Sequence, residues 1–595
     1  MTRSESLLIL SLFASPCLRP LLAQPRRDSI AFIRFNQLGY RPSGRKVAVV
    51  CSLDSSGVRS FSLLDQKGRT AWGPKRPVQG GAFGPCTTTQ RLDFSALQRE
   101  GSYRLAAAPA ETVTVRISMH AYEGAADTLL YYMREQRSGW NPVFRDSVHR
   151  RDGIIVDDPR HQGTFIPVSG GWADASDYLQ YVTTSANATF LMLMAYRDHP
   201  MAFADRFLAN GLPGTNDSPD VLDEARHGLE WLVSMYPTDD QMYNQVADDR
   251  DHSYFDLPTN DSSDYGWGKG RERPVYPCTG SPQGLFAYRN RSTGWASTAG
   301  KYAAAFALGA RLFRERDPVF SELLRSKALA ANAAGVAHPG VCQTAPARAP
   351  YFYEEDNWVD DMELAAAELH SLTGEKRYLE QALAYASREP VTPWMGQDTA
   401  RHYQFYPWHN NGHFEIWRNA DDAGKRAMSL NYRQGLELVA RRAGNGFRVG
   451  IPFIWCSNDL MVSLATQALL YRQMTGDTQF LELENAAIDW LFGTNPWGMS
   501  MVIGLPHGGA TPRDPHSAIA RQLGIELTGG LIDGPVKRSI FESLRGIRLL
   551  KPDAFARFNT GALVYHDDLG DYSTNEPIMD GTANLVYLLS ALEGR

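Results

Sequence analysis

The pattern of apolar residues changes once along the chain, near His120, and this change limits what the chain can fold into. Before it, short runs of apolar and β-branched residues, such as residues 46–50, 60–64 and 113–117, are separated by clusters of glycine, proline and serine. Runs of this length and spacing are typical of two packed antiparallel sheets. We therefore predict a small all-β sandwich of the immunoglobulin-like type at residues 30–118.

After His120 the apolar residues recur with the period of an amphipathic helix. The strongest periodic segments are residues 122–134, 178–196, 221–235, 296–313 and 460–474. Two junctions share one signature, in which Gly374 is followed by Tyr378 and Gly476 by Phe480. Glycine ends one helix, a polar residue starts the next and the aromatic residue packs the two together, which predicts an αα-hairpin.

Proline predicts the same kind of junction at Asp317-Pro318 and His199-Pro200, because proline can open a helix at its first position. About a dozen predicted helices fit six hairpins closed into a ring better than an open solenoid. We therefore predict an all-α (α/α)6 barrel at residues 119–595. Its long loops are expected to carry the functional site. They lie at residues 248–293, 406–417 and 495–551.

Charge and aromatic content favour a neutral ligand. The 595-residue chain has a formal net charge of -6, which gives no electrostatic reason to bind nucleic acid or an anionic membrane. Its 13 Trp, 26 Tyr and 26 Phe suit stacking on sugar rings, although many of them must be core residues.

The N-terminus predicts export from the cytoplasm. Arg3, an apolar run at residues 7–14 and a small-residue site near Ala23 indicate a secretory signal peptide at residues 1–24; the alternative is a short buried helix. No later segment is long enough to span a membrane. Cysteines are too sparse for a disulfide-rich scaffold and lack metal-binding spacing. We expect a secreted protein, periplasmic or extracellular, and a monomer.

Two acidic motifs carry the candidate chemistry. Asp174 and Asp177, in the stretch Gly-Gly-Trp-Ala-Asp-Ala-Ser-Asp, precede a predicted helix, where both carboxylates can face one cavity and hold a water molecule. The alternative is that Asp177 caps the helix and Asp174 is solvated. Glu576 precedes the last apolar helix, in a stretch that also contains Tyr572. Taken by itself, Glu576 fits a capping or ion-pairing role better than a catalytic one.

Together the two motifs resemble those of glycoside hydrolase family 9, the cellulase family with an (α/α)6 barrel. Its members carry a Gly-Gly-Trp and Asp-Ala-Gly-Asp block before one barrel helix and an Asp-Tyr and Asn-Glu block before the last. The stretch Ile-Arg-Phe-Asn-Gln-Leu-Gly-Tyr at residues 33–40 is similar to the opening of the immunoglobulin-like module that precedes the barrel in many bacterial members. The resemblance covers nearly the whole chain.

The resemblance implies roles for the three carboxyl groups. Asp177 would be the general base, Asp174 would help to orient the attacking water, and Glu576 would be the general acid. Inverting hydrolysis places acid and base on opposite faces of the sugar, with carboxyl groups about 6.5 to 9.5 Å apart. Glu576 must stay protonated near neutral pH, so we expect its pKa to be raised by burial and by carboxylates such as Asp567 or Asp568.

Other family features are matched only in part. The resemblance implies a structural calcium ion held by Asp223, Glu224 and Asp251, whose oxygen ligands suit that ion, and no cofactor for catalysis. The alternative for these acidic residues is a helix-dipole role. Candidate substrate-binding residues are Trp172, Trp408, His409, His516 and Tyr572; for Trp408 the alternative is buried packing.

Two departures from the family pattern bear on specificity. Ser176 stands where the family block has glycine, a small change that should keep the turn. The family segment Pro-His-His-Arg reads Pro-His-Ser-Ala here, so His516 is kept, whereas the second histidine and the arginine are replaced by Ser517 and Ala518. The missing arginine would hold sugar hydroxyl groups, and its absence counts against cellulose as the substrate.

The predicted function is hydrolysis of a β-1,4-linked or mixed-linkage glucan by an endoglucanase-like enzyme. Within the family, the alternative is an exo-acting β-glycosidase that cleaves a glucosaminide or a cello-oligosaccharide. Outside catalysis, the same scaffold could serve as a glycan-binding protein, but this would not require all three carboxyl groups. A polysaccharide lyase would need a cationic group to neutralise uronate, which the acidic motifs disfavour.

Overall fold

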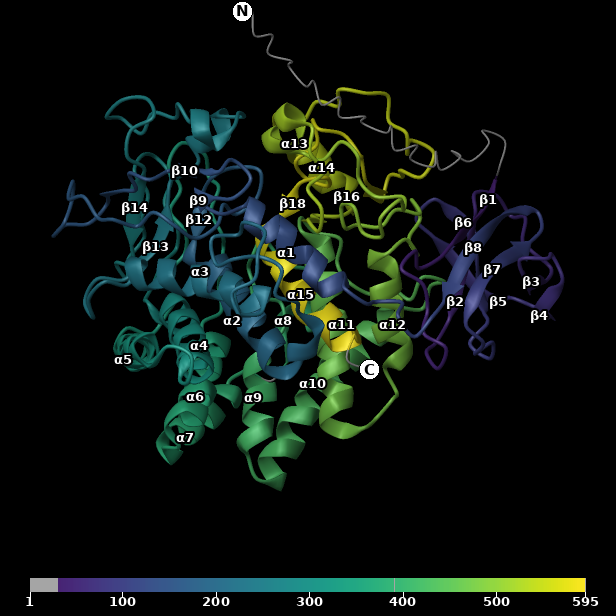
Figure 1. Cartoon of the computed structure of the whole chain (residues 1–595), viewed down its shortest axis with the longest axis horizontal. Coiled ribbons are helices and arrows are strands. Elements are labelled where there is room, and N and C mark those ends of the chain that lie inside the picture. Colours follow the sequence, from purple (N-terminus) through teal and green to yellow (C-terminus); the bar gives the residue numbers. More distant parts are fainter. Residues whose placement is uncertain (1–29, 390, 594–595) are drawn as a thin grey trace, which may run out of the picture.

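A computed structural model describes residues 30–389 and 391–593 and contains a β-sandwich followed by a helical barrel (Figure 1). The predicted signal peptide lies outside these residues. The sandwich strands are β1 (Ala31–Arg34), β2 (Val47–Ser52), β3 (Phe61–Leu64), β4 (Thr70–Lys75), β5 (Val78–Phe83), β6 (Cys86–Asp93), β7 (Gly101–Ala107) and β8 (Ala110–Ile117). They form two antiparallel sheets, in the orders β1-β2-β6-β5 and β4-β3-β7-β8. The predicted sandwich is confirmed.

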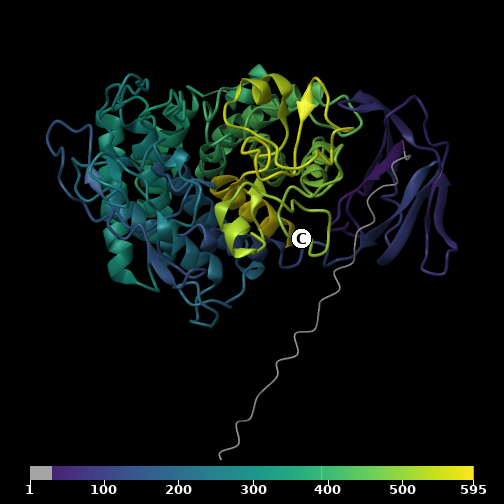
Figure 2. The same cartoon turned by 90° about the horizontal axis from the view of Figure 1, so that it is seen from above.

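Strand β2 is buried on both faces. Ala48 and Val50 pack inside the sandwich, whereas Val49 and Cys51 belong to the hydrophobic core of the barrel. Alternate residues of a strand point to opposite faces, so one apolar run can serve two cores only if both faces are covered. The sandwich therefore lies directly against the barrel, at one end of the molecule (Figure 2).

The barrel has an inner ring of helices. They are α2 (Val182–Asp198), α4 (Ala296–Phe313), α6 (Val359–Thr373), α9 (Asn411–Asn419), α11 (Ser457–Thr475) and α15 (Met579–Glu593). Each contacts the next in this order, and α15 returns to α2. Inner helices such as α2 and α15 are buried on nearly every side, as expected for helices at the centre of a large domain. The ring is closed, which confirms the (α/α)6 fold class.

Outer helices complete the hairpins. They are α1 (Ala125–Glu135), α3 (Asp220–Met235), α5 (Pro318–Ala337), α7 (Lys376–Ala386), α10 (Asp422–Arg442) and α12 (Leu481–Leu491). They pack on the inner helices in the pairs α1 with α15, α3 with α2, α5 with α4, α7 with α6, α10 with α9 and α12 with α11, and α3, α5, α7 and α10 also contact the next inner helix of the ring.

Most hairpin junctions follow the predicted chemistry. Gly374 and Gly476 end α6 and α11 in the left-handed conformation, with φ of 74° and 71°. Asp317 accepts a hydrogen bond from the backbone N–H of Phe320 at 3.0 Å and caps α5. The prediction for Pro200 is wrong, because it opens only the short 3-10 helix η1 (Pro200–Ala202), and α3 begins much later.

Loop elements gather along one side of the barrel, at the top of Figure 1. One group is the sheet β11-β14-β13-β12, formed by β11 (Ile154–Ile155), β14 (Pro274–Pro277), β13 (Tyr243–Val246) and β12 (Gln180–Tyr181). A second group pairs β15 (Leu531–Ile532) with β18 (Pro577–Ile578) and β16 (Val536–Lys537) with β17 (Leu563–Val564). Smaller pieces are β9 (Gly139–Asn141), β10 (Asp146–Val148), η2 (Asp251–Ser253), η3 (Pro258–Asn260), α8 (Pro393–Gln397), α13 (Ala518–Leu523) and α14 (Arg538–Ser543).

Polar bonds and covalent links add to this packing. Asn36 of the sandwich donates to Asp489 Oδ1 of α12 at 2.8 Å, and Arg91 forms an ion pair with Glu482 at 2.9 Å. Disulfides join Cys51 to Cys86 within the sandwich and Cys278 to Cys342 in the loops of the barrel.

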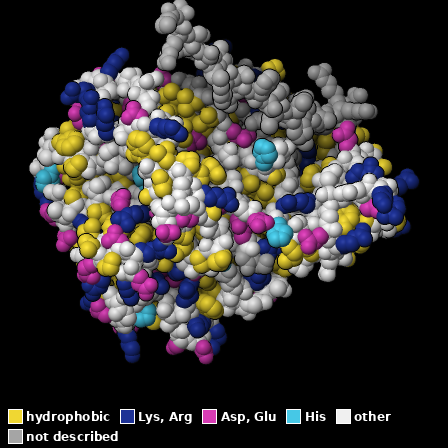
Figure 3. All heavy atoms as spheres, in the orientation of Figure 1, with side chains coloured by type: hydrophobic (Ala, Val, Ile, Leu, Met, Phe, Trp, Pro, Cys, Tyr) yellow, Lys and Arg dark blue, Asp and Glu magenta, His cyan; other side chains and the backbone are white. Residues whose placement is uncertain are grey.

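Basic and acidic side chains are intermingled on the face shown in Figure 3. In the described part of the chain, no helix has the length and apolarity needed to cross a membrane.

Candidate active site

The loop that carries Asp174 and Asp177 is tied to the start of the last barrel helix. Helix α2 begins only at Val182, so neither aspartate is its N-cap residue. The backbone N–H of Asp174 donates to Leu179 O at 2.9 Å, and its carbonyl accepts from the N–H of Met579, also at 2.9 Å. This second bond brings together the two acidic motifs, although they are far apart in sequence.

Glu576 lies next to the residue between the two aspartates. Its Oε1 accepts hydrogen bonds from the backbone N–H of Ser176, at 3.1 Å, and from the Ser176 hydroxyl. Burial and the negative charge of Asp177 raise the pKa of Glu576 to about 8. The carboxyl group is therefore mostly protonated at neutral pH and can act as an acid.

The raised pKa of Glu576 agrees with the prediction, but the charged neighbour that contributes to it is Asp177, not Asp567 or Asp568. Asp567 instead accepts the backbone N–H groups of Arg513 and Asp514, and Asp568 accepts that of Leu550 at 3.0 Å. These carboxylates stabilise loops beside the site, and the like charge that acts on Glu576 comes from Asp177.

Asp177 has one oxygen bound and one free. Its Oδ2 lies 2.9 Å from His252 Nε2, whereas Oδ1 is buried with no hydrogen-bond partner among the described residues. Burial alone would lower the pKa of His252, but the hydrogen bond to Asp177 and its charge outweigh this and raise the pKa to about 9. His252 is thus an imidazolium at neutral pH, and Oδ1 is left as an acceptor for water.

Asp174 is more enclosed than Asp177. Its Oδ1 accepts from the Thr184 hydroxyl at 2.6 Å, and its Oδ2 from the hydroxyl of Tyr353. Burial, with the charges of Asp580 and Asp177, raises the pKa of Asp174 well above its usual range. Both oxygens are occupied and the carboxyl group favours its neutral form, so Asp174 is suited to positioning and Asp177 to accepting a proton.

A row of partly exposed or exposed rings, which we call the aromatic row, runs beside the carboxyl groups. Its members, in spatial order, are Phe255, His516, Tyr572, Trp455, Tyr351 and His252. The distances between successive ring centroids in this order are 4.7, 6.0, 5.5, 6.1 and 5.3 Å. The last ring belongs to the histidine bonded to Asp177. Such a row offers faces on which sugar rings can stack.

Only two of the five predicted substrate-binding residues lie in this row, His516 and Tyr572. Trp172 is fully buried and donates its indole N–H to Glu224 Oε1 at 2.8 Å. Trp408 and His409 are 1% and 2% exposed and belong to the interior of the barrel. Their side chains are therefore not available at the surface of the site in this structure.

The three residues predicted to hold calcium, Asp223, Glu224 and Asp251, do not form one cluster in this structure, and two of them have other partners. Glu224 makes a bidentate ion pair with Arg137, at 3.0 and 2.6 Å, so a guanidinium supplies the positive charge that calcium would have supplied. The Asp223 carboxylate accepts from Asn216. Within residues 30–389 and 391–593, no three His, Cys, Asp or Glu side chains are arranged to hold a metal ion.

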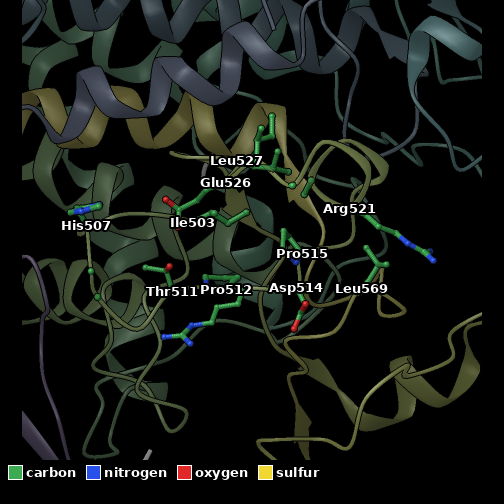
Figure 4. Close-up of a pocket in the computed structure, with 16 residues that line it drawn as sticks. Ile503, His507, Thr511, Pro512, Asp514, Pro515, Arg521, Glu526, Leu527 and Leu569 are labelled. Carbon is green, nitrogen blue, oxygen red and sulfur yellow. The ribbon is translucent and has the colours of Figure 1, made fainter. Parts of the chain in front are cut away.

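The segment that departs from the family pattern lies at the edge of the site. Ser517 caps α13, and Ala518 is buried in the first turn of that helix. A cavity of about 780 Å³ opens beside this segment and is lined by Pro515 and Leu569 among others, but by none of the three carboxyl groups (Figure 4).

Several members of the site are not predicted from the sequence. His252 follows Asp251 in the segment predicted to bind calcium, and Tyr351 and Trp455 lie in loops without a recognised motif. A signal was available for Trp455 alone, because an aromatic residue just before the start of the predicted helix at 460–474 would lie on the loop side of the barrel.

Both parts of the chain match known protein families. Residues 122–589 match the family model for Glycosyl hydrolase family 9, and residues 29–112 match that for the Cellulase N-terminal ig-like domain. The first match covers most of the chain.

Individual relatives agree with these matches. Endoglucanase C of Cellulomonas fimi is 26% identical over 603 residues, which cover 94% of this chain and 51% of that protein, so the chain spans about half of its length. A xyloglucan-specific endo-beta-1,4-glucanase of Bacteroides ovatus is 27% identical, with 94% and 93% covered. The crystal structure of a metagenome-derived glycoside hydrolase family 9 endoglucanase superposes with a TM-score of 0.75 and 25% identity, covering 95% of this chain and 99% of that one.

Proposed function

We propose, from the fact that this protein belongs to glycosyl hydrolase family 9, that it cleaves β-1,4-linked or mixed-linkage glucan. The proposed cleavage is at internal bonds of the polysaccharide and inverts the anomeric configuration. One observation carries the proposal. A carboxyl group that is protonated at neutral pH, Glu576, lies near the carboxylate of Asp177, whose Oδ1 is free to accept a proton. Inverting hydrolysis needs one group of each kind.

In the proposed reaction, Glu576 donates its proton to the oxygen of the leaving sugar as the glycosidic bond breaks. Asp177 accepts a proton from the water that attacks the anomeric carbon from the opposite face. The imidazolium of His252 fixes Oδ2 of Asp177 and leaves Oδ1 for that water. Asp174, held by Thr184 and Tyr353, orients the loop and the water.

The proposed substrate follows from the aromatic row and from the charge of the site. Adjacent stacking faces suit an extended β-linked glucan, and the acidic groups offer nothing to neutralise a uronate. An exo-acting β-glycosidase for cello-oligosaccharides or glucosaminides is the second candidate. The family pattern has an arginine at the position of Ala518. Its absence favours this second candidate, because fewer hydrogen-bond donors are left to hold a long neutral glucan.

We also propose that the protein works outside the cytoplasm. The signal peptide predicted at residues 1–24 and the two disulfides support this, because disulfides persist mainly in oxidising compartments. The relevant measurement is the fraction of full-length protein found in periplasm and medium. Retention in the cytoplasm with free thiols would contradict the proposal.

The decisive experiment is incubation with barley-type mixed-linkage glucan, carboxymethyl cellulose, xyloglucan and chito-oligosaccharides. Reducing ends measure cleavage, product lengths separate internal from terminal attack, and proton NMR reads the first anomer formed. We expect internal cleavage and the α-anomer. Release of the β-anomer or of an unsaturated sugar would reject the mechanism.

Variant Glu576→Gln tests the acid, and it should lower kcat on glucan by about 10²- to 10⁴-fold. It should keep much more of its activity on β-cellobiosyl fluoride, whose leaving group needs no proton. The exposed Glu542→Ala is the matched control. Equal losses on both substrates would argue against the role of Glu576 as the acid.

A further inference from the structure

Asp533 is a fully buried carboxyl group that none of the steps above uses. It directly follows β15, which pairs with β18, and β18 begins just after Glu576. The backbone N–H of Asp533 donates to the carbonyl of Glu576 at 2.9 Å. The backbone of Asp533 is therefore bonded to that of the proposed acid.

The side chain of Asp533 points to a different part of the site. Its Oδ2 accepts a hydrogen bond from the indole N–H of Trp455 at 2.9 Å, and its Oδ1 accepts one from the thiol of Cys456 at 3.3 Å. Trp455 is in the middle of the aromatic row, between Tyr572 and Tyr351. One residue thus touches both the stacking surface and the acid.

The backbone at Cys456 indicates that this geometry is imposed by the surroundings. Cys456 has a φ of 62°, in the left-handed region that a side chain disfavours. Such a conformation persists where neighbouring contacts hold it, and it is often found at functional sites. Here the contacts include the thiol bond to Asp533 and the bond from Asn458 N–H to Asp533 O at 2.9 Å.

The ionisation of Asp533 is consistent with a supporting role. Burial, followed by the charge of Glu576, raises its pKa well above the usual range, and the charge of Asp580 acts in the same direction. The bonds from Trp455 and Cys456 oppose this only in part. In its neutral form the carboxyl group still accepts the indole N–H and places no negative charge behind Glu576.

We propose that Asp533 is a positioning residue that holds the Trp455 ring in the aromatic row at a fixed place relative to Glu576. This inference rests on the proposed function. A sugar stacked on Trp455 would then present its glycosidic oxygen to the acid in a constant register. The side chain acts through Trp455, so its contribution is to substrate binding more than to the chemical step.

The test uses full-length protein, a series of cello-oligosaccharides and the variants Asp533→Ala, Asp533→Asn and Trp455→Phe. Losing one hydrogen bond corresponds to about a tenfold change in binding. We expect Asp533→Ala to raise KM about tenfold, with kcat within about threefold of wild type. Asp533→Asn keeps an acceptor for the indole and should stay close to wild type. Trp455→Phe keeps a ring but loses the donor, so it should raise KM as well.

The double variant separates positioning from general damage. If Asp533 acts through Trp455, Asp533→Ala combined with Trp455→Phe should raise KM no further than Asp533→Ala alone, because both remove the same bond. Additive effects, or an unchanged KM in Trp455→Phe, would overturn the inference. If Asp533→Ala does not fold, the KM of Trp455→Phe tests the inference by itself. If the wild-type protein cleaves no glucan, the proposed function and this inference are both rejected. If the wild type is active but the effects of the two substitutions on KM add up, the inference alone is rejected.

Discussion

Replacement of Ser176 is the sharpest test of what sets the pKa of the proposed acid, Glu576. Its hydroxyl and its backbone N–H both donate to Glu576 Oε1, and both bonds favour the charged carboxylate, so they lower the pKa that burial and Asp177 raise. Replacing Ser176 with alanine removes one donor and keeps the other. The pKa of Glu576 should therefore rise above its value of about 8.

These contacts set the size of the expected pKa shift. A hydrogen bond to a charged group contributes about 1.5 to 3 kcal/mol, and the lower end applies because Glu576 is only half-buried and keeps its backbone donor. One pKa unit corresponds to about 1.4 kcal/mol, so the expected shift is about one unit. The alkaline limb of kcat/KM should move from near pH 8 to near pH 9, while the rate at pH 6 changes little.

The assay is kcat/KM on cellohexaose between pH 4 and pH 10, for wild type, Ser176→Ala and Ser176→Gly. Glycine is the residue of the family block at this position and should shift the limb in the same direction. Ser102→Ala, an exposed serine of β7, is the control. An alkaline limb that stays in place or moves to lower pH would refute the assignment of that limb to Glu576 and the role of Ser176.

Three further predictions concern the proposed base Asp177, the neighbouring Asp174 and the loops. His252→Ala removes a charged partner of Asp177 and should lower kcat on glucan by about 10- to 100-fold, whereas His252→Gln, which keeps a donor, should lose less; similar losses in both would contradict the role of the bond. Tyr353→Phe removes the donor to Asp174 Oδ2 and should lower kcat about tenfold with KM nearly constant, as read from initial rates on mixed-linkage glucan; a change confined to KM would count against Asp174 as a positioning group. Replacing Cys278 and Cys342 by serine should lower the free energy of unfolding by about 2 to 4 kcal/mol, measured by urea denaturation, because their bond closes a loop of 64 residues; equal stability would show that the loop is held by other contacts.

Much of the fold follows from local chemistry that can be read in the sequence. Gly374, Gly476 and Asp317 end or start helices as their side chains predict, because a positive φ or a cap is decided within one turn. The helix start predicted at Pro200 is wrong because proline permits a helix to begin but does not require one. The chain instead forms turns until Asp220, whose side chain accepts the backbone N–H groups of Arg206 and Phe207.

The site was only partly predictable, for a physical reason. Asp174, Asp177 and Glu576 stand in motifs next to helix starts, so their proximity followed from family resemblance. Tyr351 and Trp455 reach the site through long loops, and loop paths depend on tertiary contacts that have no sequence period. The roles of Asp223, Glu224 and Asp251 are ambiguous in the sequence, because carboxylates suit a calcium ion and the positive end of a helix equally well. For Glu224, the position of Arg137 in the structure shows that the carboxylate forms an ion pair.

The two-sided burial of β2 has a consequence for shortening this enzyme. A fragment lacking residues 30–118 would uncover the barrel surface now covered by Phe32 and Val49, and would leave the carboxyl group of Asp489 without its Asn36 donor. The β-sandwich is thus a structural part of the catalyst, not an appendage. Substitutions on its inner strand should alter the heat tolerance of hydrolysis even though they lie far from any sugar.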